Sequence, residues 1–153
     1  MSVDICGFLE LSVFEGEELK EDYAWMSCLD IGTLGLCFGD ECRILFGESK
    51  DTLAHRTVPD KWPPIAKRRG LPPNMSGPTA REVGEPREND LTTNAPGYTF
   101  IGYEELENVA WQAYSGAVLD VNEVYGWGLL LSLMKQLDTA GYSQRLVVWF
   151  SWY

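Results

Sequence analysis

The chain has 153 residues, of which 45% are hydrophobic and 12% aromatic, and its formal net charge is -11. This length and composition exclude wholesale disorder and predict one packed domain over residues 1–153. The excess of acidic residues, 23 against 12 basic ones, disfavours direct binding to nucleic acid phosphates, which requires clustered lysine and arginine.

The first residues, "MSVDICGFLE", lack the basic and apolar regions of a signal peptide, and no stretch approaches the ~18 apolar residues of a membrane span. We therefore expect a cytoplasmic protein that does not contact a membrane. The four cysteines form no C-x-x-C pair and His55 is the only histidine, so the sequence predicts neither a metal site nor a cofactor. We expect the thiols to be reduced and mostly buried.

Two strands are predicted near the start of the chain. Residues 2–11, "SVDICGFLEL", alternate with apolar character on both faces, which is typical of a central strand. After the charged connection "FEGEELKED", residues 23–31, "YAWMSCLDI", form a second strand, most simply antiparallel to the first. A short helix is expected around residues 40–47, with Asp40 as its N-cap.

Periodicity disappears between residues 50 and 97, where all eight prolines of the chain lie. The sequence predicts one long irregular loop here, wrapping the outside of the domain. Loops of this length are uncommon in compact domains unless they are functional or partly disordered. The loop also differs in charge, because residues 50–87 carry 8 basic and 4 acidic groups, a net charge of +4.

A short strand and two helices follow the loop. The stretch "YTFIGYEEL" predicts a strand that leads into a helix, with Gly102 at the cap and Glu105 three residues on. The second helix is expected to begin with the capping-box pair Asp120 and Glu123 and to end at Gly141. Residues 144–153, "QRLVVWFSWY", then form a buried strand. The expected fold is α+β: a small, mainly antiparallel sheet that includes the first and last strands and is covered by two helices.

The stretch "AKRRGLPPNMS", residues 66–76, is the first candidate site. Gly70 permits a tight turn and two prolines fix an extended exit, so the segment has a specified shape without any ligand. The functional alternative is a tip that binds an anion or a partner, and its residues would be Lys67, Arg68, Arg69, Gly70 and Arg81, with His55 nearby.

The remaining signals for chemistry are weak. The carboxylate runs "EGEELKED" and "YEELE" are more typical of solvated faces than of metal or acid-base sites. His55 has no accompanying nucleophile motif. We therefore predict no catalytic residue, and the sequence favours a noncatalytic protein over an enzyme.

The aromatic end of the chain is a candidate anchor for a partner. In "WFSWY" the aromatic side chains alternate between the two faces of a strand. One face can be core, and the other either packs under a helix or is exposed. An exposed aromatic strip would provide an anchor for a protein partner, and its candidate residues are Trp149, Trp152 and Tyr153. The sequence leaves both alternatives open.

Five stretches, "SVDICGFLEL", "ILFGESK", "PIAKRRGLPPNMS", "YTFIGYEEL" and "LMKQLDTAGYSQRLVVWFSWY", together resemble an uncharacterised family of small proteins from phages, prophages and actinobacteria. Its motifs, in the same order, look like SVDIHG, LFGVR, RGLPxDVS, SWLTxxEL and VRIVFWF. Several positions depart from that pattern: Asn74 and Met75 replace its Asp-Val pair, Phe100 its tryptophan and Gly102 its threonine. The family's histidines before SWLT are absent, which argues further against an enzyme. The resemblance implies a phage accessory protein without assigning an activity.

Three functions follow as hypotheses. The first is a small acidic, phage-encoded protein that binds and modulates a host protein, a component of host defence being one candidate target. Its acidic surface would suit a basic cleft. The alternative is a binder of, or an enzyme acting on, a small anionic ligand held by the basic loop. The third is a structural role with symmetric self-association into a homo-oligomer.

Overall fold

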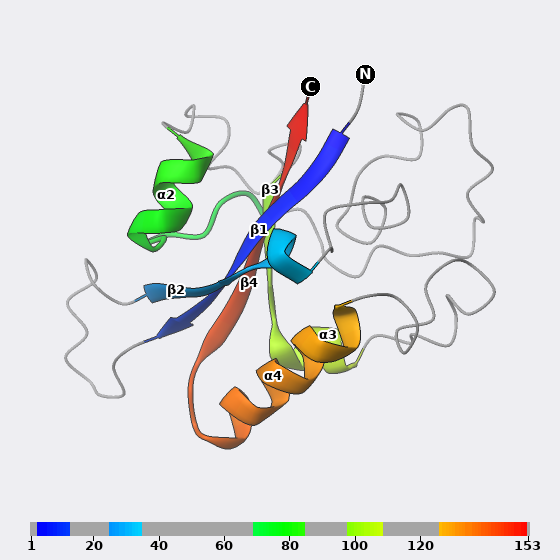
Figure 1. The fold of residues 1–153 in the computed structure, drawn as a ribbon. Coiled ribbons are helices and arrows are strands. Elements are labelled where there is room, and N and C mark those ends of the chain that lie inside the picture. Colours follow the sequence, from blue (N-terminus) through cyan, green and yellow to red (C-terminus); the bar gives the residue numbers. More distant parts are fainter. Residues whose placement is uncertain (1–2, 13–24, 35–68, 85–97, 109–125, 153) are drawn as a thin grey trace.

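The computed structural model describes residues 3–12, 25–34, 69–84, 98–108 and 126–152 (Figure 1). Four strands form one sheet, β1 (Val3–Ser12), β2 (Trp25–Asp30), β3 (Tyr98–Gly102) and β4 (Gln144–Trp152). The helical elements are the short 3-10 helix η2 (Ile31–Leu34) and the α-helices α2 (Gly77–Val83), α3 (Tyr103–Glu107) and α4 (Trp127–Thr139). The predicted α+β fold is confirmed.

The strands lie in the order β2-β1-β4-β3, and every neighbouring pair is antiparallel. The first and last strands are therefore paired in the middle of the sheet, with Val3 opposite Trp152 and Leu11 opposite Gln144. The sequence of β4 explains its central place, because five consecutive residues from Arg145 to Trp149 are buried. A strand buried on both faces needs apolar residues on both faces.

The two faces of the sheet are covered by different parts of the chain, as Figure 1 shows with α2 on one side and α3 and α4 on the other. On the first face, Leu71, Val147 and Trp149 form a buried cluster. Strand alternation directs Leu146 and Val148 to the opposite face. There α4 carries the fully buried Leu130 and Met134.

The segment 69–84 corrects the prediction of an irregular outer loop. Residues 69–76 have buried members, Gly70, Leu71 and Pro72, and α2 begins directly after them, with Ser76 as N-cap and a proline in its first turn. Ser76 and Pro78 are favourable residues at a helix start, but a helix of seven residues is too short for periodicity to reveal it. The rest of the predicted loop, 50–68 and 85–97, lies outside the described residues, as does the helix predicted at 40–47.

The helix boundaries agree with the prediction only in part. Gly102 and Glu105 cap α3 as predicted, with the Gly102 amide donating to Glu105 Oε2 at 3.0 Å. Gly141 ends α4 with φ 88°, and the hydrogen bonds Tyr142 N to Leu137 O (3.0 Å) and Gly141 N to Asp138 O (2.9 Å) make a Schellman motif.

The start of α4 differs from the prediction. The helix begins at Trp127 behind an N-cap at Gly126, where φ is 93°. A residue in the left-handed conformation does not continue a right-handed α-helix, so α4 does not extend back through Gly126. The predicted capping pair Asp120 and Glu123 lies outside the described residues.

Candidate functional site

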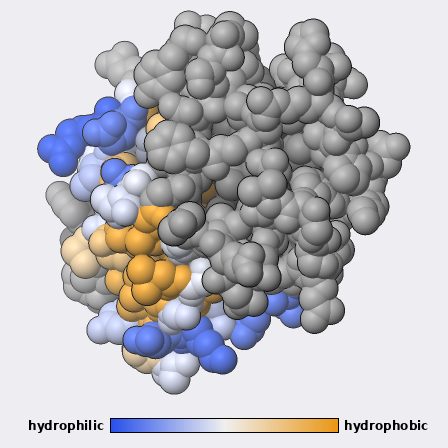
Figure 2. Space-filling model, turned by 45° about the vertical axis from the view of Figure 1, so that its right-hand side comes forward, coloured by the Kyte–Doolittle hydropathy of each residue, from blue (hydrophilic) through white to orange (hydrophobic). Residues whose placement is uncertain are grey.

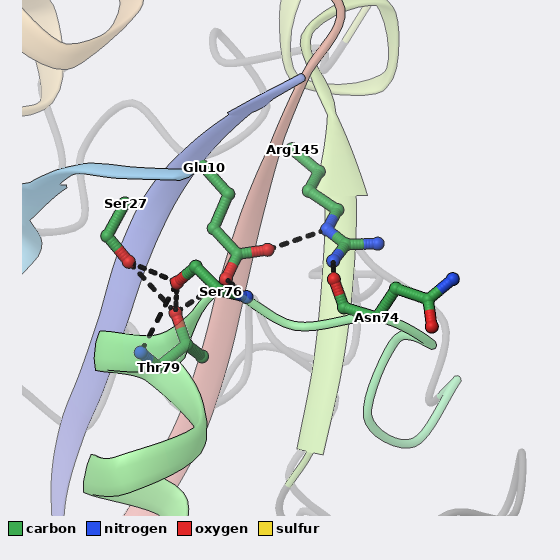
Figure 3. A network of polar contacts seen from close by, with 6 residues as sticks. All are labelled: Glu10, Ser27, Asn74, Ser76, Thr79 and Arg145. Carbon is green, nitrogen blue, oxygen red and sulfur yellow. Dashed lines mark hydrogen bonds and ion pairs between the residues drawn. The ribbon is translucent and has the colours of Figure 1, made fainter. Parts of the chain in front are cut away.

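A buried ion pair joins the two central strands. Glu10 on β1 stands opposite Arg145 on β4, and Arg145 Nε donates to Glu10 Oε2 at 2.8 Å. Glu10 is 0% exposed and Arg145 7%. The strand register places both side chains on the face that α2 covers (Figure 3). A charge this deeply buried is tolerated only where its partners satisfy it.

The second oxygen of Glu10 is held by the segment 69–84. Glu10 Oε1 accepts from the Ser76 amide at 2.9 Å and from Thr79 Oγ1 at 2.6 Å. The Ser76 hydroxyl also contacts Thr79 Oγ1 at 2.8 Å and accepts from the Thr79 amide at 3.3 Å. The N-cap of α2 is thus bonded to the carboxylate of a strand.

Ser27 on β2 extends this network to a third strand, because its hydroxyl contacts both Ser76 Oγ and, at 3.2 Å, Thr79 Oγ1. The guanidinium of Arg145 makes two further contacts. Its Nη2 donates to the Asn74 carbonyl at 3.1 Å, and its Cζ lies 3.9 Å from the centre of the Trp25 ring. Burial lowers the pKa of Arg145, while the hydrogen bond and charge of Glu10 act in the opposite direction.

This network acts as a clamp. It is made of Glu10, Ser27, Asn74, Ser76, Thr79 and Arg145, and we call it the Glu10 clamp. Three strands and the 69–84 segment meet in it, so it fixes the segment against the sheet. Its hydroxyls and charged atoms contact one another (Figure 3). A buried polar network that is satisfied in this way favours one arrangement of the core.

The predicted basic site is only partly within the described residues. Arg69 is turned toward the protein: it forms a two-pronged ion pair with Glu105, one bond being Nη1 to Oε2 at 2.7 Å. It also donates to the Phe100 carbonyl at 3.0 Å and lies over that ring at 5.6 Å. The hydrogen bond to Glu105 raises the pKa of Arg69. Arg69 therefore holds the segment to β3 and α3.

The other members of the basic site are placed differently. Gly70 is buried with φ 70°, which makes the turn that the sequence predicts. Arg81 is exposed on α2. Lys67, Arg68 and His55 lie outside the described residues. Within the described part, the structure gives Arg69 and Gly70 roles in the shape of the segment.

The aromatic anchor is contradicted at Trp149. This side chain is 8% exposed, belongs to the cluster with Leu71 and Val147, and contacts the Phe8 ring at a centroid distance of 5.9 Å. It is covered because the 69–84 segment lies on its face of the sheet. Trp152 belongs to β4, but its side chain, like Tyr153, is outside the described residues. The expectation of buried thiols fails at Cys28, which is exposed, whereas Cys6 is half-buried.

A cleft of about 430 Å³ opens between the start of α3 and the end of α4. Three carboxylates line it, those of Glu104 and Glu105 on α3 and of Asp138 on α4, together with Tyr142 and Gln144. Glu105 is engaged with Arg69. Near this cleft, Tyr103 donates to Glu107 at 2.8 Å, and burial, with Glu107 and Asp138 adding to it, raises the pKa of Tyr103 to about 12.

Sequence reasoning missed Glu10, Ser76, Thr79 and Arg145. A partial signal was present, since Ser76 followed by Gly77 and Pro78 is typical of a helix start. The pairing of Glu10 with Arg145 depends on strand register across 135 positions, and no local pattern reports that. Of the cleft carboxylates, Glu104 and Glu105 were noted from the sequence, but only as part of a solvated run, and Asp138 was not noted.

Comparison of the chain with family models, curated proteins and solved structures finds no match. None of the helices in the described ranges is long and apolar enough to cross a bilayer. Among the same residues, no three or more His, Cys, Asp or Glu side chains are grouped to hold a metal ion.

Proposed function

We propose that this chain is a small acidic accessory protein that binds and modulates another protein without catalysing a reaction. One observation carries the proposal. Arg69 and Arg145 are turned toward the protein and paired with Glu105 and Glu10, and the exposed residues that remain in the described part include more carboxylates than cations. Among the residues whose burial the structure describes, the exposed carboxylates are Asp30, Glu82, Glu104, Glu107 and Asp138, and the exposed cations are Arg81 and Lys135.

Such a surface is suited to a basic partner. Together with the net charge of -11, it attracts cationic surfaces and accelerates encounter with them. The same charge disfavours nucleic acid as the direct ligand. The family resemblance adds the origin and target: we take the protein to be phage-encoded and its partner to be a host protein, with defence components among the candidates.

Apolar groups on the surface favour a protein partner over a small ion. Met26, Leu129 and Tyr142 are 51%, 62% and 47% exposed. Figure 2 shows hydrophobic residues gathered on one face of the described part, with hydrophilic residues above and below them. Protein interfaces combine such apolar or aromatic centres with polar rims.

The alternative, a small anionic ligand bound by the basic loop, has less support. It needs several cations directed at one point, yet Arg69 is already neutralised by Glu105 and stacked on Phe100. Arg69 would have to exchange an intramolecular carboxylate for the ligand. A protein partner on the acidic surface requires no such exchange.

The test is native mass spectrometry of the tagged chain recovered from an actinobacterial lysate at two salt concentrations. We expect a stoichiometric protein complex that weakens steeply between 0.1 and 1 M salt, where the screening length shortens from roughly 10 Å to roughly 3 Å. A retained small molecule in place of a protein would support the alternative. A protein complex that is insensitive to salt would contradict the charge-driven mode of binding.

A further inference from the structure

We propose that the cleft between α3 and the end of α4 receives an arginine side chain of the partner protein. This assignment rests on the proposed function and names the contact that would carry it. The cleft is open, has a volume of about 430 Å³ and is lined by Glu104, Asp138, Tyr142 and Gln144 among others. Three independent features of these residues fit a guanidinium.

The first feature is uncompensated negative charge. Glu104 and Asp138 are exposed, and in the described part of the chain neither has an ion-pair partner. Asp138 stands in the last turn of α4, which contains no basic residue. The carboxyl end of a helix itself carries partial negative charge, so a cation is favoured there and an aspartate is not. A bound cation would compensate both the charge of the carboxylates and the partial negative charge at the end of α4.

The second feature is a buried acceptor on Gln144, a residue that lines the cleft. The amide nitrogen of Gln144 donates to the Met134 carbonyl at 2.6 Å, which fixes the orientation of the side chain. Its oxygen, Oε1, is buried and has no hydrogen-bond partner among the described residues. A buried acceptor without a donor is costly, and most are satisfied in folded proteins. A guanidinium in the cleft would bring N–H donors close to the residue that carries this acceptor.

The third feature is the combination of an aromatic ring with fixed walls. Tyr142 lines the cleft and is 47% exposed, so its ring is accessible to a planar cation. The Schellman hydrogen bonds at Gly141 and Tyr142 and the bond from Gly102 to Glu105 hold two walls in place. Arginine suits this set better than lysine, because its planar fork of five donors binds carboxylates in pairs and stacks on rings.

The ligand chemistry is tested by NMR titration of the full chain with N-acetylarginine methylamide. We expect saturable shifts of the backbone amides of Gly102 and of residues 141–144. The neutral citrulline analogue should leave these amides unshifted. Equal shifts with citrulline would overturn the assignment of a cation site. Equal binding of N-acetyllysine methylamide would overturn the assignment to a guanidinium.

The site is tested with the double variant Glu104→Gln and Asp138→Asn, which keeps the shape of both side chains. We expect it to bind the arginine probe at least about tenfold more weakly. The matched control is Glu82→Gln, which removes an exposed carboxylate from α2 on the other side of the sheet and should bind as the wild type does. Unchanged affinity in the double variant would place the probe elsewhere and overturn the assignment.

The same variants separate this assignment from the proposed function. If the double variant retains a salt-sensitive partner as tightly as the wild type, the function stands and the arginine cleft is overturned. If no partner protein is recovered but the wild type binds the arginine probe and the double variant does not, the cleft stands and the proposed function fails.

Discussion

Among the described residues, Glu10 is the one whose substitution should lower the free energy of unfolding most. Its two oxygens hold Arg145, Thr79 and the Ser76 amide in a fully buried place. The variant Glu10→Gln leaves the Arg145 charge buried without a counter-charge, so we expect the free energy of unfolding to fall by about 3–5 kcal/mol. Urea denaturation followed by circular dichroism measures this loss.

The control for Glu10 is the same substitution at an exposed carboxylate, Glu82→Gln, which should change the unfolding free energy by less than about 0.5 kcal/mol. A double variant, Glu10→Gln with Arg145→Met, should recover part of the loss, because it removes the stranded charge as well. A loss equal to that of the exposed control would show that the Glu10 clamp contributes no stability.

Tyr103 gives the protein a pH dependence in alkaline solution. Its pKa is raised from 10.0 to about 12, so between these values the folded chain binds more protons than the unfolded chain. The free energy of unfolding must therefore fall as pH rises through this window. Urea midpoints from pH 9 to 12 should fall less steeply in Tyr103→Phe than in the wild type. Identical slopes in the two proteins would contradict the raised pKa.

At the scale of elements, Gly126 sets where α4 begins. Its φ is 93°, and a Cβ at this position would lie 2.3 Å from the Leu34 carbonyl oxygen. We expect Gly126→Ala to lower the free energy of unfolding by at least about 2 kcal/mol, through backbone strain and the contact with η2. Chemical denaturation of the purified variant measures the change.

Gly77 is the matched control for Gly126. It is also at the start of a helix, but a Cβ there meets no atom within 4 Å and its φ is not positive. Gly77→Ala should therefore leave stability unchanged or raise it by up to about 1 kcal/mol. Equal losses in the two variants would mean that helix-start glycines are needed in this chain for some other reason.

The strands, α3 and α4 differ in how far the sequence predicts them. Strands were predictable because alternation and β-branched residues report local burial, and the capping of α3 and the end of α4 follow from local residue types. The start of α4 was not predictable, because it depends on the contact between Gly126 and Leu34, 92 positions apart. The Glu10 clamp was hidden for the same reason, since its partners meet only after β1 and β4 have paired in register.

The first and last strands pair in the middle of the sheet, so the stability of the described sheet depends on the pairing of β4 with its two neighbours. Val147 lies on β4, with Phe8 of β1 on one side and Phe100 of β3 on the other, and it is fully buried against Leu71. If β4 opens, β3 loses the one strand it pairs with in the described sheet, and β1 keeps only the short β2. We therefore expect the slowest-exchanging amides of β1, β3 and β4 to exchange only through global unfolding.

Hydrogen exchange of Val147→Ala tests this cooperativity. Removing two buried methyl groups should lower the free energy of unfolding by roughly 2 kcal/mol. All slow amides of the three strands should then exchange roughly 30-fold faster, by a common factor. The control Val83→Ala, on α2 at the margin of the same core, should accelerate these amides much less. If Val147→Ala speeds exchange in β4 alone, the sheet opens strand by strand and does not unfold as one unit.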